Sequence, residues 1–229
     1  MARYIWTILA GLCATTAQGV AQTPPSPSEV AAYRGLHAAA AAGNAGEVAR
    51  LIAAGADVAA RDSHGRTPVH VAAHGSHYGA VEALVKGGAD ARALDSQQYD
   101  IVTIAAVKDD ERMLKLTLEL GGSARDITSP YEGTALIAAA HLGHDGVVRM
   151  LIAAGAPLDH VNNLGWTALI EAVILGDGGP RHVACVQALV AAGANRALAD
   201  RGGATPLDHA RRRGYAAMIS ILEPAAQKR

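Results

Sequence analysis

Four histidines lie close together in this chain, and their spacing is the one most suited to holding a metal ion. They are His64, His70, His74 and His77. His70 and His74 are four residues apart, which would place both imidazoles on one face of a helix. Zinc sites use three or four ligands, however, and no cysteine or carboxylate joins the cluster in a ligand motif. The sequence therefore predicts no metal and no cofactor.

Motifs of catalysis and of nucleic-acid binding are missing from the sequence. It has no Gly-x-Ser-x-Gly, no His-Glu-x-x-His and no motif of paired carboxylates. The glycines at 176–180 are not followed by the Lys-Ser/Thr of a phosphate-binding loop. A net charge of −1 provides no field that would attract a polyanion. We therefore expect a protein that is not an enzyme and does not bind nucleic acid.

The elements that would position any functional side chain repeat along the chain. One position of the repeat, which we call the repeated slot, recurs after 33 or 34 residues. The spacing is 38 residues once, where the fifth unit carries an insertion. The residues in this slot are Arg34, Thr67, Asp100, Thr134, Thr167 and Thr205. A period of this length is typical of a stacked array, in which each small unit buries its apolar face against its neighbours.

Each unit is predicted to contain two helices. Threonine followed by proline, as at Thr67 and Pro68, starts a helix because the hydroxyl caps free amides and proline fits the first turn. An amphipathic second helix follows, and a glycine with positive φ is expected to end it. These glycines are Gly55, Gly88, Gly155 and Gly193. Apolar residues at 113–120 alternate as in a strand, but the register of the repeat predicts a helix there.

The chain resembles the ankyrin repeat. The motif is carried by Asp62-x-x-Gly65-x-Thr67-Pro68-Val69-His70 and again by Asp200-x-x-Gly203-x-Thr205-Pro206-Leu207. The resemblance implies an all-α fold, an ankyrin-repeat solenoid of helix-turn-helix units with projecting β-hairpin-like loops. It covers about residues 29–224, with units at about 29–61, 62–94, 95–128, 129–161, 162–199 and 200–224 and a tail at 225–229. His70 and His77 fill consensus positions, which leaves His64 and His74 as the metal candidates.

The first 21 residues resemble a secretory signal peptide. Arg3 precedes an apolar stretch too short for a comfortable membrane span, and small residues at 19–21 fit a cleavage site. A lipoprotein anchored at Cys13 is the rival interpretation. A Pro-rich linker at 22–28 would follow, and Cys185 would remain as a lone, buried thiol. We therefore expect an exported bacterial protein of the periplasm, monomeric and not inserted in the membrane after cleavage.

The resemblance also implies a binding surface, formed by the loop tips and the first helix of each unit. Aromatic and arginine side chains dominate interaction hot spots. Arg66, Tyr99 and Trp166 share one loop-tip slot and would form a ladder along this surface. The predicted partner-binding residues are Arg66, Tyr99, Tyr131, Trp166, Ile174, Leu175 and Arg212, and the same register places Leu142 and Leu164 beside them.

The function expected from these residues is non-catalytic binding of a periplasmic protein partner, as a scaffold or modulator. An inhibitor or immunity partner of a toxic enzyme is one alternative. The other is a metal- or small-ligand-binding protein that uses His64 and His74, with His141 as a further ligand. The third unit lacks the Thr-Pro-x-His motif and is expected to be the weakest joint of the stack.

Overall fold

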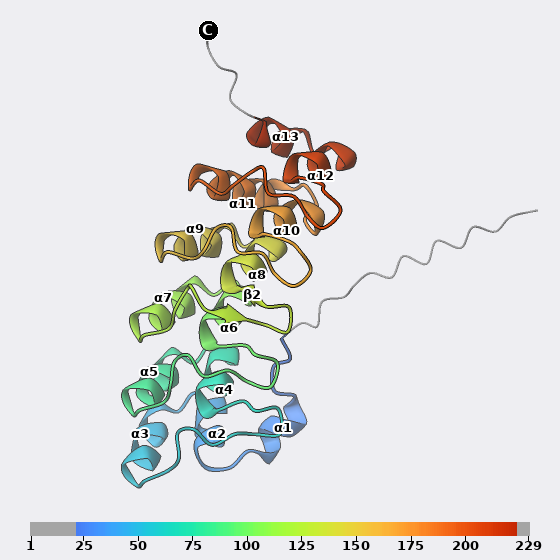
Figure 1. The fold of residues 1–229 in the computed structure, drawn as a ribbon. Helices are drawn as coiled ribbons and strands as arrows, with labels where there is room; N and C mark the ends of the chain where they lie inside the picture. The colour runs from blue at the N-terminus through green and yellow to red at the C-terminus, as the bar shows by residue number, and fades with distance from the viewer. Residues whose placement is uncertain (1–21, 224–229) are drawn as a thin grey trace, which may run out of the picture.

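A computed structural model of the chain describes residues 22–223, and within them the helices stack in two layers (Figure 1). The first layer consists of α2 (Gly35–Ala41), α4 (Pro68–His74), α6 (Ile101–Val107), α8 (Ala135–Leu142), α10 (Ala168–Ile174) and α12 (Pro206–Arg213). The second layer consists of α3 (Ala45–Ala53), α5 (Tyr78–Lys86), α7 (Glu111–Glu119), α9 (Asp145–Ala153), α11 (Pro180–Ala191) and α13 (Ala216–Leu222). We number the units 1 to 6 by these successive helix pairs, and the predicted all-α solenoid is confirmed.

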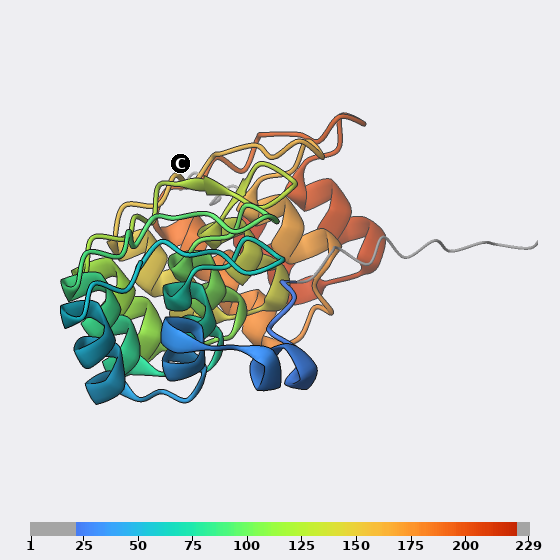
Figure 2. The same ribbon diagram turned by 90° about the horizontal axis from the view of Figure 1, so that it is seen from below.

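Extended loops connect each unit to the next and lie side by side along one edge of both layers (Figure 2). The loop between units 3 and 4 includes a short antiparallel pair, β1 (Ile127–Thr128) and β2 (Gly133–Thr134). In its register, Ile127 faces Thr134 and Thr128 faces Gly133. The projecting loops are therefore hairpin-like, as the resemblance implied.

Local hydrogen bonds explain why the helices begin at the repeated slot. The hydroxyls of Thr134 and Thr167 accept from the amides of Ile137 (3.3 Å) and Ile170 (3.2 Å), which would otherwise be unpaired at the first turn. At the start of α4 the amide of Thr67 itself is paired, because it donates to the imidazole Nδ1 of His70 at 3.1 Å. The first helices of units 2 to 6 thus begin with hydrogen bonds made by their own sequence, whereas α2 begins after Arg34 without a side-chain cap.

The second helices end at glycines in the left-handed region, as predicted. The φ angle is 84° at Gly55, 100° at Gly88, 80° at Gly155 and 95° at Gly193. A side chain at such angles is strained, so glycine ends the helix at the lowest cost. The alternating stretch 113–120 forms most of α7, which confirms that the register of the repeat prevails over its strand-like pattern.

The core lies between the two layers and is built from alanine, leucine and valine. Ala72, Ala106 and Ala140 of the first layer and Leu84 and Leu151 of the second are fully buried. Small side chains in the first layer let its helices approach closely, and the larger ones fill the space between layers. None of the helices in the described residues is both long and apolar enough to cross a bilayer.

One further helix, α1 (Pro27–Ala32), stands outside the two layers. It follows the extended residues 22–26, and together they run beside the hairpin tips of the first units (Figure 1). The expected linker at 22–28 therefore passes into a helix at Pro27, with Ser26 as its N-cap. The expected signal peptide at 1–21 and the tail at 225–229 lie outside the described residues.

Candidate functional site

The hairpin tips share one turn geometry, in which an acidic or amide side chain accepts two backbone amides. Asp62 Oδ1 accepts from the amides of His64 (2.8 Å) and Arg66 (2.9 Å). The same pair of bonds is made by Asp95 to Gln97 and Tyr99, by Asn162 to Leu164 and Trp166, and by Asp200 to Gly202 and Ala204. Such turns are dictated by the local sequence. The slot shared by Arg66, Tyr99 and Trp166 is thus one backbone position in three units.

The structure corrects the expectation that Arg66 is an exposed anchor, because its side chain is only 1% exposed. Its guanidinium donates from Nε to Asp62 Oδ2 at 2.7 Å, within its own turn. It also donates from Nη1 to the carbonyl oxygen of Thr23 at 3.2 Å and from Nη2 to the carboxylate of Glu29. The N-terminal segment thus takes the position in which a partner was expected.

Tyr99 is also buried, at 6% exposure, so the expectation of an accessible Tyr99 is wrong as well. Burial, followed by the neighbouring Tyr131 and Asp95, raises the pKa of its phenol to about 12. The N-terminal segment reaches this turn too, where the amide of Thr23 donates to Gln97 Oε1 at 3.3 Å. The N-terminal residues therefore contact Arg66 of unit 2 directly and the turn that holds Tyr99 in unit 3.

The remaining predicted residues lie in units 4 to 6 and keep access to solvent. Tyr131, Trp166 and Ile174 are half-buried, and Leu175 and Arg212 are exposed. Leu142 and Leu164 stand out beside them, at 42% and 39% exposure. We call the hairpin tips and the first-helix ends of units 4 to 6 the open inner surface. Its residues are Tyr131, Leu142, Leu164, Trp166, Ile174, Leu175 and Arg212.

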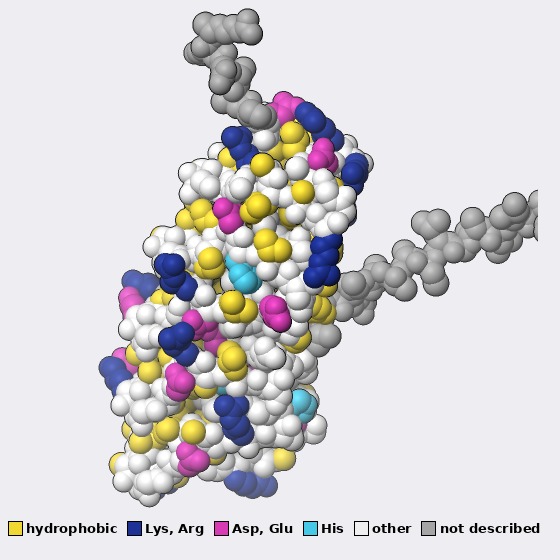
Figure 3. Space-filling view, viewed as in Figure 1, with side chains coloured by type: hydrophobic (Ala, Val, Ile, Leu, Met, Phe, Trp, Pro, Cys, Tyr) yellow, Lys and Arg dark blue, Asp and Glu magenta, His cyan; other side chains and the backbone are white. Residues whose placement is uncertain are grey.

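A second apolar stripe runs along the hairpin loops and was missed from the sequence. Leu94, Ile127 and Val161 are exposed by 37%, 56% and 48% and occupy matching positions in consecutive units. Figure 3 shows hydrophobic side chains in a broken column on this loop face. An open hollow of about 660 Å³ lies between Leu94 and Ile127, spanned by the ion pair of Arg92 and Asp126 at 2.6 Å. In the sequence, an apolar residue recurs six or seven residues before the repeated slot, and this recurrence could have revealed the stripe.

Most of the histidines act as ties between units rather than as ligands. His70 Nε2 donates to the carbonyls of Ala93 (2.9 Å) and Tyr99 (3.1 Å), and burial lowers the pKa of this imidazole. His77 Nε2 donates to the carbonyl of Ala41 at 2.9 Å. Both consensus histidines therefore have the loop- and helix-tying roles that the resemblance implied.

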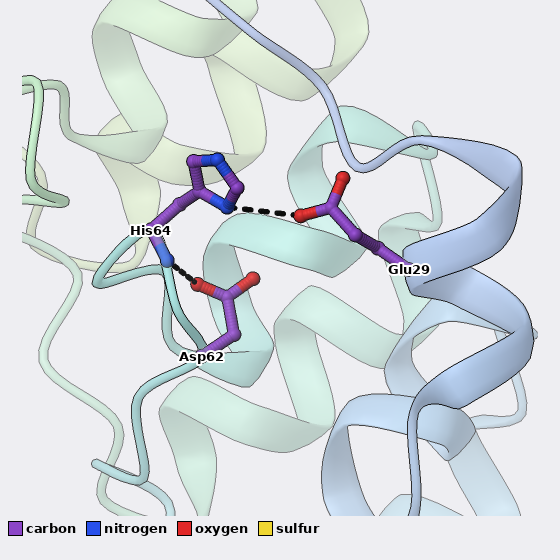
Figure 4. A group of neighbouring side chains, drawn as sticks. All are labelled: Glu29, Asp62 and His64. Atoms are coloured by element: carbon purple, nitrogen blue, oxygen red, sulfur yellow. Dashed lines mark hydrogen bonds and ion pairs between the residues drawn. The ribbon is translucent and has the colours of Figure 1, made fainter.

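His64 lies in a group of side chains that could ligate a metal, but this group differs from the predicted pair of His64 and His74. Its Nδ1 lies 2.9 Å from Glu29 Oε1, and its amide donates to Asp62 (Figure 4). Two carboxylates thus join His64, contrary to the expectation from the sequence, and no such group within residues 22–223 includes His74. Arg66 already bridges both carboxylates. A metal ion would have to displace this cation or stand beside it, which electrostatics opposes.

Cys185 is a buried thiol on the second layer, as predicted. Burial raises its pKa to about 12, which keeps it protonated near neutral pH. A protonated, enclosed thiol is a poor nucleophile. Cys185 therefore contributes to the core of unit 5 rather than to a reactive site.

Comparison with known proteins places the chain in a family. Ankyrin-repeat family models match residues 36–85 and 102–200. An ankyrin repeat domain from Acinetobacter baumannii AYE is 42% identical, with a TM-score of 0.77, and the match covers 82% of this chain and 95% of that one. The ankyrin repeat protein EF0377 is 30% identical, with a TM-score of 0.77 and coverage of 83% and 98%. The human ASB11 ankyrin repeat domain is 25% identical, with a TM-score of 0.70 and coverage of 86% of each chain.

No functionally curated protein matches the sequence, so the comparisons supply a fold and a kind of module without a named partner. Ankyrin repeats are in general modules of protein–protein interaction and are typically non-catalytic scaffolds. The stacked helix pairs, the threonine caps and the hairpin turns described above are this module's framework. The chain belongs to the ankyrin-repeat family.

Proposed function

We propose that this protein is a non-catalytic binding module of the bacterial periplasm that holds a partner protein on its open inner surface. The observation that carries the proposal is the difference between the two halves of the array. Equivalent slot residues are buried at Arg66 and Tyr99 but accessible at Trp166. A partner can therefore reach the tips and first-helix ends of units 4 to 6 without moving any described part of the chain.

The chemistry of the open inner surface indicates what the partner should offer. Exposed leucines at 142, 164 and 175 share this surface with Trp166. Exposed apolar side chains often mark an interaction site, and tryptophan is enriched in interaction hot spots. The exposed arginines 211 to 213 of α12 lie at the end of the surface in unit 6. The preferred partner would thus present apolar side chains to units 4 and 5 and a carboxylate toward unit 6.

The periplasmic location rests on the sequence of residues 1–21. A positive residue, a short apolar stretch and small residues in that order are typical of a cleaved export signal. Fractionation of the producing bacterium tests it, since the proposal requires the mature chain in the periplasmic extract. Replacement of the apolar residues at 5–9 by charged ones should retain the chain in the cytoplasm.

The binding surface is tested by crosslinking and affinity capture from periplasmic extract with the full chain and two matched variants. Trp166→Ala combined with Leu175→Ser alters the open inner surface, whereas Ile127→Ser combined with Val161→Ser alters the apolar stripe on the loop face. We expect the first variant to lose the captured partner by at least about tenfold, because truncated hot-spot side chains cost about 1–2 kcal/mol each. The second variant should capture the partner as the unaltered chain does.

Two results would overturn this assignment of the surface. Loss of capture with the Ile127/Val161 variant alone would move the interface to the loop face. Equal capture by all three chains would remove both surfaces from the interface. Native circular dichroism and an unchanged midpoint of urea unfolding must accompany each variant, so that a folding defect is not mistaken for a lost contact.

A further inference from the structure

The guanidinium of Arg66 is the centre of the contact between the N-terminal segment and the array. Two of its nitrogens serve that segment: Nη2 donates to the Glu29 carboxylate, and Nη1 donates to the Thr23 carbonyl at 3.2 Å. Within the turn itself, Nε donates to Asp62, and Nη2 also lies 3.3 Å from Nδ1 of His64. Without residues 22–29, Arg66 would keep its orientation and present both Nη atoms, the fork that binds a carboxylate with two hydrogen bonds.

The segment that fills this position contributes little burial of its own. None of the residues of α1 is buried, and Val30, its largest apolar side chain, remains exposed. Its recorded links to the array are polar, through Thr23 and Glu29. Polar contacts of this kind contribute far less than a buried apolar face. The segment is therefore bound to the array without being part of its core.

The seam between segment and array is also incompletely filled. A cavity of about 120 Å³ lies between Pro24, Pro25 and Val30 on one side and Val71 and His74 on the other, with Ala41 and Gly75 completing its lining. His74 is nine-tenths buried, and its Nε2 has no hydrogen-bond partner. An unpaired buried polar atom is costly, and a ligand that supplied its partner would be favoured. This observation is independent of the Arg66 contacts.

We propose that the inner surface of units 1 to 3 is a second peptide-binding site, specific for an extended segment of another protein that carries a carboxylate, and that the chain's own residues 22–32 occupy this site until such a partner replaces them. The carboxylate takes the position of Glu29 on Arg66. A polar group of the same segment reaches His74 Nε2, which residues 22–32 leave unsatisfied. The proposal extends the proposed function, because it adds a site at the opposite end of the array from Trp166.

Two features of the N-terminal segment show why the ligand should be extended and acidic. Residues 22–26 are non-helical and contain Pro24 and Pro25, which favour an extended backbone with little conformational entropy to lose. Glu29 stays ionised, since hydrogen bonds from Ser26 and the contact with Arg66 lower its pKa to about 2. The segment is in effect a ligand tethered to its own receptor, at an effective concentration in the millimolar range. A partner in solution must compete with that tether.

The test uses the full chain and a fluorescent peptide with the sequence of residues 22–32 as the probe. Anisotropy titrations compare the unaltered chain with Glu29→Gln, which weakens the tethered segment and leaves the receptor residues intact. We expect the Glu29→Gln chain to bind the peptide about tenfold more tightly, because charge-assisted hydrogen bonds are about twice as strong as neutral ones. Glu47→Gln is the matched control: Glu47 pairs with Arg50 at 2.7 Å on α3, so this chain should bind as the unaltered one does.

A second peptide, with glutamine in place of the glutamate, separates the role of the carboxylate from that of the backbone. It should bind the Glu29→Gln chain about tenfold more weakly than the first peptide. Equal affinity of the two peptides, equal affinity of the two chains, or no binding to the Glu29→Gln chain at millimolar peptide would each overturn the proposal. Trp166→Ala should leave peptide affinity unchanged, so this site and the open inner surface succeed or fail separately.

Discussion

At the scale of single residues, the histidines differ in whether a ring nitrogen reaches a backbone carbonyl. His77, His144 and His182 occupy equivalent positions of the repeat. Each donates at 2.9 Å to a carbonyl near the end of the first helix of the preceding unit. His74 does not occupy this position of the repeat, and its buried Nε2 has no hydrogen-bond partner. Burial, reinforced by His70, Arg66 and Lys108, lowers its pKa to about 4. Histidine thus links neighbouring units at three positions, whereas at His74 it destabilises the fold.

Replacement of His74 by leucine should make the protein less sensitive to mild acid. Between pH 6.5 and pH 4 the unfolded chain binds a proton at His74 that the folded chain does not, so stability falls as the pH falls. At pH 5 this difference amounts to about 2 kcal/mol. We expect the gain in unfolding free energy from His74→Leu to be larger at pH 5 than at pH 7.5 by about that amount.

Urea unfolding at the two pH values checks this prediction, with His160→Leu, in the loop between α9 and α10, as the control. His160 Nε2 donates to the carbonyl of Glu132 at 2.6 Å, so its loss should weaken the protein at both pH values. The carboxylates of Asp62 and Glu29 have pKa values lowered to about 2 and titrate only in stronger acid. A gain from His74→Leu that is the same at both pH values would contradict the assignment.

At the scale of the elements, the first helices of units 2 to 6 are capped at the repeated slot, by threonine in four units and by an aspartate in unit 3. Asp100 Oδ1 accepts from the amide of Thr103 at 2.7 Å, which caps α6 as a hydroxyl would. Its Oδ2 is buried without a partner, and burial raises the pKa of the carboxyl. The cap is therefore kept at the expense of one unsatisfied oxygen.

Asp100→Thr should stabilise the array by about 1 kcal/mol at pH 7, because it keeps the cap and removes the buried unpaired oxygen. The gain should shrink at pH 3.5. Below the unfolded pKa of 3.8 the carboxyl is protonated in both states, so its penalty in the folded chain is lost. Urea unfolding of the unaltered chain and of Asp100→Thr at pH 7 and pH 3.5 measures the gain in stability and its decrease in acid.

Asp110→Thr provides the matched control for this experiment. Asp110 caps α7 by accepting from the amide of Met113 at 2.9 Å, and the Tyr78 hydroxyl donates to both of its oxygens. Threonine there would keep a cap but lose the tyrosine contact, so the array should be weakened. Stabilisation by Asp110→Thr, or destabilisation by Asp100→Thr, would refute the account of the caps.

At the scale of the whole molecule, the helix pairs repeat regularly along the stack. The two halves of its inner surface differ, however, in what covers them. Units 1 to 3 lie against the chain's own residues 22–32, and units 4 to 6 present leucine and tryptophan to solvent. Stability in such arrays spreads by contacts between nearest neighbours, so a weak unit divides the stack into two cooperative halves. The division expected at unit 3 would lie close to the boundary between the covered and the open surface.

Hydrogen exchange should therefore show faster exchange in α6 and α7 than in α8 and α9. The physical reason is that the cap of unit 3 carries the buried, unpaired oxygen of Asp100, whereas unit 4 is capped by Thr134. Exchange followed by mass spectrometry on the full chain resolves the four helices. Protection of α6 and α7 among the strongest in the molecule would show that the third unit is not its weak joint.

The sequence by itself determined the repeat, the helix pairs and the geometry of the hairpin tips. These features depend on hydrogen bonds between residues only a few positions apart, such as Thr134 with Ile137 and Asp62 with Arg66. A local pattern repeated six times in the sequence is therefore sufficient to predict them. The same logic identified Trp166, Tyr99 and Arg66 as occupants of one slot.

Only the tertiary structure decided which of these slots a partner can reach. Arg66 is covered by Thr23 and Glu29, which precede it by 43 and 37 residues, and the contact from Thr23 to Gln97 spans 74 residues. No periodicity relates these positions, because the N-terminal segment is outside the repeat and its docking depends on charge and space that exist only after the units have stacked. The contacts that cover Arg66, and the assembly of Glu29 with Asp62 and His64, followed from that docking.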